Sequence, residues 1–150
     1  LRKIDTPSVL FFLGILLAVA SLQSMGQLRD LAVALDNSIG TDTEGGVFIV
    51  SIIIGLLSSI VDNVPLVAAA MGMYEVTADG LFIQDGVFWQ FLAYCAGTGG
   101  SALIIGSAAG VAVMGLEKIP FGWYLKNISL LALVGYFAGA AVYILERTLF

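Results

Sequence analysis

An aspartate and a proline interrupt the most apolar stretch of this chain, which runs from Gly46 to Tyr74. These 29 residues would form a single helix roughly 44 Å long, which exceeds a hydrocarbon core of about 30 Å. Pro65 removes a backbone donor and disfavours helix at the residue before it, so we expect a break at 62–65. The stretch is therefore predicted to fold as two limbs of about 16 and 10 residues, and neither crosses a membrane comfortably.

The composition places the chain in a membrane. Hydrophobic residues make up 59% of the sequence and charged residues 11%, and the mean hydropathy is +1.02, which is outside the range of soluble domains. The net charge is −5 and there is no basic tract, so neither nucleic acid nor a polybasic lipid contact is expected. We expect an all-α integral membrane protein, placed in the bacterial inner (cell) membrane.

The residue types argue against an enzyme. Histidine is absent, which excludes Ser-His dyads and histidine metal sites. The one cysteine, Cys95, lies in an apolar run and is interpreted as a structural thiol without a disulfide. An intramembrane aspartic protease would need a second aspartate in an apolar run, and Asp42, Asp79 and Asp85 all lie outside such runs. No catalysis and no cofactor are expected.

Two continuous spans are expected near the ends of the chain. The first covers about residues 7–22, where Thr6-Pro7 supplies an N-cap and a first-turn proline. The last covers about residues 128–145. Because the chain begins at Leu1 rather than Met, we interpret it as one membrane domain in a piece of a longer polypeptide.

Two further helix signals precede the long apolar stretch. From Leu28 the apolar residues recur at helical spacing and charged residues face elsewhere, as in an interfacial helix. Thr41-x-x-Glu44 has the spacing of a capping box, which predicts a helix start near Asp42.

A second interrupted helix is expected over residues 87–114. Its limbs are 87–96 and 101–114, and Gly97-Thr98-Gly99-Gly100 stands between them. Glycine holds a regular helix poorly, so this segment is predicted to unwind near the middle of one membrane crossing.

Charge in the connections predicts the topology. Residues 23–45 carry one basic side chain against four acidic ones, and residues 75–86 carry three acidic and no basic side chains. Residues 116–127 carry Lys118 and Lys126, so the positive-inside rule places them, with Arg2-Lys3, in the cytoplasm. Both flanks of the apolar stretch then lie on the opposite face. We therefore expect a re-entrant hairpin with Asp62-Asn63 at its tip.

The two breaks together suggest an ion site. A carboxylate at membrane depth is costly and indicates an ion or proton pathway. Asp62 would supply the charge, and the helix ends after Val61 and Ala96 would aim free carbonyls at a cation. These are hard ligands suited to Na⁺ or Li⁺. The neutral oxygens expected around Asp62 are those of Asn63, Ser58, Ser59, Thr98, Ser101 and Ser107.

Each of these residues also has a purely structural explanation. Asp62 and Asn63 could cap the second limb of the hairpin, and the serines could bond back to helix carbonyls. The unwound segments would comprise Pro65, Gly97, Gly99 and Gly100, although glycines also serve tight helix crossings.

Three motifs carry a family resemblance. SSIVDNVPLVAAAM at 58–71, GTGGSALIIGSAAGVA at 97–112 and MGLEKIPFGWYLK at 114–126 resemble the C-terminal part of the NhaD-type sodium/proton antiporters of the ion transporter superfamily. The resemblance implies one of two inverted repeats, each with a re-entrant hairpin and a broken helix, with Asp62-Asn63 at the hairpin tip and Thr98 and Ser101 in the broken helix. The resemblance also implies a missing N-terminal half as a partner; the lipid bilayer and a second copy in a homodimer are the other partners expected.

The function expected from these observations is secondary active transport that exchanges Na⁺ or Li⁺ for H⁺. Asp62 would hold either a cation or a proton, and the scaffold would alternate access. Two alternatives stay open. One is a related transporter for anions such as arsenite or dicarboxylate, which half-helix N-termini could bind but which Asp62 argues against. The other is a non-transporting fragment or assembly subunit, which the short length favours.

Overall fold

The computed structural model describes residues 6–149, and it is helical throughout, as the composition predicts. Within these residues no named strand occurs, and Thr77 and Ile83 form an isolated bridge. The elements are α1 (Thr6–Ser24), α2 (Gln27–Ile39), α3 (Glu44–Leu57), α4 (Asn63–Met73), α5 (Val87–Gly99), the 3₁₀ turns η1 (Gly100–Ala102) and η2 (Ile104–Gly106), α6 (Ala108–Leu116), α7 (Phe121–Asn127) and α8 (Ser129–Leu149).

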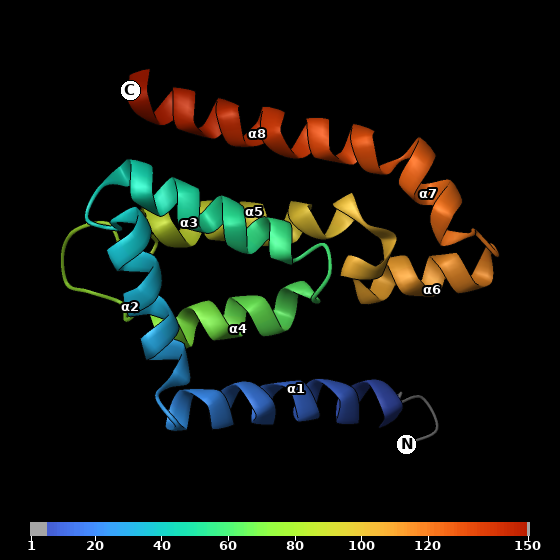
Figure 1. Ribbon diagram of the computed structural model, residues 1–150, viewed down its shortest axis with the longest axis horizontal. Helices are drawn as coiled ribbons and strands as arrows, with labels where there is room; N and C mark the ends of the chain where they lie inside the picture. Colours follow the sequence, from blue (N-terminus) through green and yellow to red (C-terminus); the bar gives the residue numbers. More distant parts are fainter. Residues whose placement is uncertain (1–5, 150) are drawn as a thin grey trace.

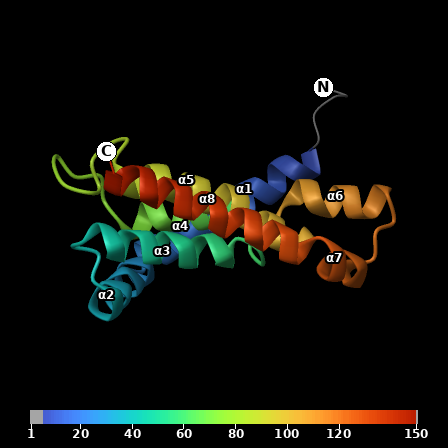
Figure 2. The same ribbon diagram turned by 90° about the horizontal axis from the view of Figure 1, so that it is seen from above.

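The longer helices run side by side along the long axis of the molecule. Figure 1 shows α8 at one edge, α3 and α5 next to it, then α4, and α1 at the other edge. Seen from above, α8 crosses over α3 and α5 (Figure 2). The α3–α4 hairpin extends only partway along the axis, whereas α5 and α6 together continue to the far end (Figure 1). The hairpin tip therefore lies within the length of the bundle.

Aromatic side chains join α3, α5 and α8. The ring centroids of Phe48 and Phe91 are 5.1 Å apart in an edge-to-face pair, and Phe91 stacks on Tyr143 at 4.9 Å. The hydroxyl of Tyr136 donates a hydrogen bond of 2.9 Å to the carbonyl of Ile52. Such ring pairs contribute about 0.5–1.5 kcal/mol each beyond their burial, so these three helices form one packed unit.

Glycine allows α3 and α5 to cross closely. A Cβ atom on Gly99 would overlap the carbonyl oxygen of Gly55, and one on Gly55 would lie 2.7 Å from the Cβ of Cys95. Cys95 is fully buried at this crossing. Backbone approach of this kind needs a residue without a Cβ at the contact.

Among the described residues, α8 is long and apolar enough to cross a membrane, with 21 residues. Helix α1 has 19 residues, and both helices lie where the sequence predicts continuous spans. Helix α2 forms as expected, with Leu28 and Ala32 buried.

The start of α3 differs from the prediction. Thr43, rather than Thr41, is the N-cap, and its hydroxyl accepts a hydrogen bond of 3.1 Å from the Gly46 amide. Thr41 instead donates to a carboxylate oxygen of Asp36 at 2.5 Å. Because α3 begins at Glu44, the residue directly before it, Thr43, occupies the N-cap position, and Thr41 lies too far upstream to cap the helix.

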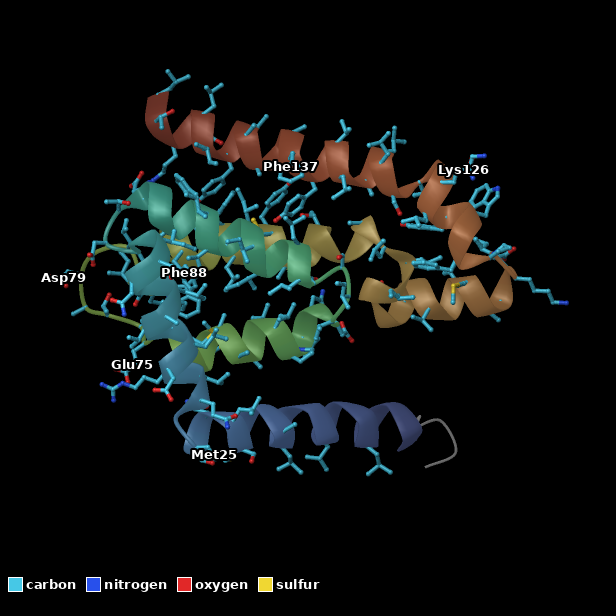
Figure 3. All side chains as sticks on the ribbon, in the orientation of Figure 1. Met25, Glu75, Asp79, Phe88, Lys126 and Phe137 are labelled. Carbon is cyan, nitrogen blue, oxygen red and sulfur yellow. The ribbon has the colours of Figure 1, made fainter. Side chains whose placement is uncertain are left out.

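The acidic loop after α4 and Lys126 lie at opposite ends of the bundle. Glu75 and Asp79 lie at the end where α2 packs, and Lys126 lies at the other end (Figure 3). Arg147, near the end of α8, pairs with Glu44 at 3.3 Å, which brings the start of α3 to the same end as the acidic loop. The start of α3 and the loop that follows α4 thus lie at the same end of the bundle, while the membrane face predicted for them stays a prediction; the prediction for Arg2-Lys3 falls outside the described residues.

Candidate functional site

The hairpin tip consists of residues 58–62. Helix α3 ends at Leu57, whose carbonyl accepts hydrogen bonds of 3.0 Å from the amides of Ile60 and Val61. Helix α4 then begins at Asn63, so Pro65 lies in its first turn. The expected break at 62–65 is corrected to 58–62, because a first-turn proline gives up no helical hydrogen bond.

The second interruption, unlike the first, lies later in the sequence than expected. Gly97 and Gly99 are part of α5, which ends at Gly99, and the irregular backbone covers residues 100–107. Leu103 is extended, with φ −125° and ψ 137°, and Ser107 is extended as well. The prediction that Gly97 and Gly99 unwind is therefore wrong. The helical penalty of a glycine, about 1 kcal/mol, is outweighed at Gly99 by its fit against Gly55.

The two interruptions touch each other. The buried hydroxyl of Ser58 donates a hydrogen bond of 2.8 Å to the carbonyl of Ala96. A Cβ atom on Gly106 would lie 2.5 and 2.6 Å from the carbonyl oxygens of Ser58 and Ser59, and 2.7 Å from that of Gly100. Only glycine fits where three carbonyls converge in this way. Figure 1 shows the turn after α3 level with the start of the break.

Several predicted hydroxyl ligands make local hydrogen bonds. Ser59 donates to the Leu56 carbonyl at 2.7 Å, and Thr98 donates to the Tyr94 carbonyl at 2.7 Å. Ser107 caps α6 by accepting a hydrogen bond of 3.0 Å from an amide. A hydroxyl that donates locally keeps its lone pairs free for a cation. These bonds therefore hold the oxygens of Ser59 and Thr98 in place without using their acceptor capacity.

Asp62 is half-buried, and its carboxylate neither caps α4 nor pairs with a described basic side chain. It occupies the N-cap position of α4, but its side chain makes no capping hydrogen bond. Within residues 6–149 the ion pair that forms is the one between Arg147 and Glu44, so no described basic side chain neutralises Asp62. Neighbouring Asn63 lines an open groove of about 370 Å³ along α4 with Val64, Val67, Ala68 and Met71.

The structure brings together some of the predicted residues. Ser58, Ser59 and Gly100 meet at the contact between the two interruptions. Within the described part of the chain, no hydrogen bond joins Asp62 or Asn63 to Thr98, Ser101 or Ser107. The same residues contain no group of three acidic or cysteine side chains able to hold a metal ion. Asp62 thus stands as a single carboxylate near irregular backbone.

Two residues at this contact are missed by the sequence interpretation. Gly106 has a signal, because Gly106-x-x-x-Gly110 is a small-residue pattern, but its partners are loop carbonyls rather than another helix. Tyr124 on α7 has no such signal in the sequence. Its hydroxyl donates a hydrogen bond of 2.8 Å to the carbonyl of Ser101, 23 residues earlier in the chain.

Comparison with known proteins identifies similar sequences. The family model described as "Citrate transporter" (CitMHS) matches residues 1–89. Sodium/proton antiporter 1 of Arabidopsis thaliana is 53% identical over 99% of this chain and 24% of its own length. The Na⁺/H⁺ antiporter NhaD of Halomonas elongata is 34% identical over 97% of this chain and 27% of its own length.

The NhaD of Vibrio cholerae is also 34% identical, over 92% of this chain and 26% of its own length. The chain thus spans about a quarter of the length of these three curated relatives. No solved structure matches significantly. The resemblance to NhaD-type antiporters predicted from the three motifs is confirmed.

Proposed function

Because this chain belongs to the citrate transporter (CitMHS) family, we propose that it is the cation-binding part of a secondary transporter that exchanges Na⁺ or Li⁺ for H⁺. It is an integral membrane protein. The observation that carries the proposal is the carboxylate of Asp62, which is half-buried at the hairpin tip and makes no capping hydrogen bond. A charge kept at such depth without a structural use favours ion or proton transfer.

The mechanism uses one carboxylate for two ligands in turn. Asp62 binds a hard cation when ionised and releases it when protonated, so Na⁺ and H⁺ exclude each other at the same oxygens. The hydroxyl oxygens of Ser59 and Thr98 and the carbonyls at the two interruptions are oxygen ligands of the kind that Na⁺ takes. The close approach of Gly106 to the carbonyl oxygens of Ser58 and Ser59 keeps the backbone oxygens of the second interruption near the tip.

The proposed membrane placement makes α3 and α4 a re-entrant hairpin. It is supported by the acidic loop lying at the end where α3 begins and by Lys126 lying at the opposite end (Figure 3). Cysteines at the exposed positions Asp42 and Asp79 should react with an impermeant thiol reagent from the same, non-cytoplasmic side. A cysteine at Glu117 should react only from the cytoplasm. The background is Cys95→Ala, and reaction of the first two positions from opposite sides would exclude the hairpin.

Anion transport is the second candidate, because the matching family model is described as a citrate transporter. Against it, the start of α4, which is the helix N-terminus at the tip, carries Asp62, and a carboxylate repels a citrate anion at the site that would otherwise attract it. The relatives named as sodium/proton antiporters align with nearly the whole chain, which further favours the cation.

One experiment separates the two candidates. The full-length transporter is reconstituted in proteoliposomes with an internal pH dye and given Na⁺, Li⁺ or citrate. The cation proposal predicts proton movement on adding Na⁺ or Li⁺ in the absence of citrate, and none on adding citrate without them. Citrate uptake without Na⁺-driven proton movement would overturn it and support the anion candidate.

The remaining partners follow from the proposal. The rest of a longer polypeptide would complete the transport site, and a homodimer is the proposed assembly. The bacterial inner membrane is the proposed location, although the 53% identity to an Arabidopsis protein makes a plant membrane an equal fit.

A further inference from the structure

The irregular backbone between α5 and α6 needs hydrogen-bond partners that its own helices do not supply. Carbonyls at membrane depth are tolerated outside a helix only when protein or a cavity satisfies them. Two side-chain hydroxyls from elsewhere in the sequence reach carbonyls in this segment or in the last turn of α5 directly before it. Ser58 bonds the Ala96 carbonyl from the hairpin tip, and Tyr124 bonds the Ser101 carbonyl from α7 at 2.8 Å.

Tyr124 is well placed to hold this segment. Helix α7 continues into α8 with only Ile128 between them, and the Ile128 amide donates a hydrogen bond of 2.8 Å to the carbonyl of Tyr124. The Tyr124 side chain, with Gly100, Ser101 and Ser107, lines a groove of about 290 Å³ between α6, α7 and the break. The phenol therefore reaches from the base of α8 into the groove beside the interruption.

We propose that Tyr124 is a positioning residue for the cation site. Its hydroxyl fixes the Ser101 carbonyl, and through it the stretch from Gly100 to Gly106 that lies against the carbonyls of Ser58 and Ser59. Without this hydrogen bond the stretch gains alternative conformations, and the oxygens at the contact lose their fixed spacing. This inference rests on the proposed cation exchange for its functional consequence, but its structural part stands independently.

The chain offers a matched control in Tyr94. Its hydroxyl also donates to a backbone carbonyl, that of Tyr136, at 2.9 Å. That bond joins two regular helices, α5 and α8, rather than the interruption. The same hydroxyl has a second, longer contact of 3.5 Å with the carbonyl of Gly135, also in α8. Tyr94→Phe and Tyr124→Phe thus each delete one phenolic oxygen that donates to backbone carbonyls, and they differ in where those carbonyls lie.

The first measurement is the Na⁺ dependence of exchange by the full-length transporter in proteoliposomes. Tyr124→Phe should weaken the apparent Na⁺ affinity by about fivefold, the factor expected for one hydrogen bond, with a smaller change in the maximal rate. Tyr94→Phe should leave the affinity within about twofold of wild type. Equal shifts in the two variants, or no shift in either, would overturn the proposal.

The second measurement does not depend on which ion is transported. Ala102 lies in η1 and is 4% exposed, so a cysteine there reports opening of the segment. In a Cys95→Ala, Ala102→Cys background, Tyr124→Phe should raise the rate of thiol modification several-fold over Tyr94→Phe. An unchanged rate overturns the proposal whatever the transport result.

The two measurements separate the two hypotheses. If the wild type exchanges no Na⁺ for H⁺, the proposed function fails, while the modification rates still decide whether Tyr124 holds the segment. If the modification rate rises but the Na⁺ affinity of an active transporter does not change, Tyr124 is structural and the positioning role is excluded.

Discussion

The two helix interruptions of this protein meet but are built from different residues. The hairpin tip, residues 58–62, contains Asp62 and two serines and no glycine, whereas the break at 100–107 contains Gly100 and Gly106 and no ionisable group. The tip thus contributes a charged side chain, and the glycines of the break allow its backbone to pack closely against the tip without side chains in between.

The close crossing of α3 and α5, at the end of α5 just before the second interruption, predicts the largest effect on folding. Gly99→Val would place a branched side chain on the backbone of Gly55, where neither helix can yield, and should cost about 3 kcal/mol or more. The control is Gly97→Ala, because Gly97 has open space within 4 Å and lies in the same helix. It should change stability by about 1 kcal/mol or less. Thermal unfolding of the detergent-solubilised full-length protein measures both; equal stability of the two variants would refute the close crossing.

The contact between the two interruptions predicts an intermediate effect. Ser58→Ala removes the hydroxyl that donates to the Ala96 carbonyl in a fully buried position, and it should cost about 1–3 kcal/mol. Ser38 makes a similar bond, to the Ala34 carbonyl at 2.7 Å, on the exposed side of α2. Ser38→Ala should therefore stay within about 0.5 kcal/mol. A cost for Ser58→Ala no greater than that for Ser38→Ala would mean that the contact adds nothing to the fold.

The first turn of α4, directly after the tip, predicts the smallest effect, at Pro65. Because Pro65 lies in the first turn of α4, Pro65→Ala breaks no helical hydrogen bond and should cost about 0.4–1 kcal/mol through the unfolded chain. Val67→Pro, two residues further into α4, should cost about 3 kcal/mol or more. If Pro65→Ala proved as damaging as Val67→Pro, the proline itself would define the break and α4 would begin later.

The sequence predicts the helical class, the two interruptions and the placement of Asp62 at a hairpin tip. It places the first interruption three to four residues too late and the start of the second three residues too early, because it weighs proline and glycine by their local propensities. Gly99 stays helical owing to Gly55, 44 residues away in sequence, and Pro65 is tolerated owing to its position in the first turn. The hydrogen bond of Tyr124 joins residues 23 positions apart in the sequence, and no local sequence pattern predicts it.

The central proposal is that the carboxylate of Asp62 couples Na⁺ movement to H⁺ movement, and proton fluxes through charge-neutral variants test it. Proton fluxes are recorded in proteoliposomes containing the full-length transporter, across pH at several Na⁺ concentrations, for wild type, Asp62→Asn and the exposed-loop control Asp79→Asn. Competition of Na⁺ and H⁺ for one carboxylate predicts that raising Na⁺ restores activity at lower pH in wild type and in Asp79→Asn. Asp62→Asn should show no Na⁺-driven proton movement while inserting and melting like wild type. Exchange by Asp62→Asn at the wild-type rate would contradict the account.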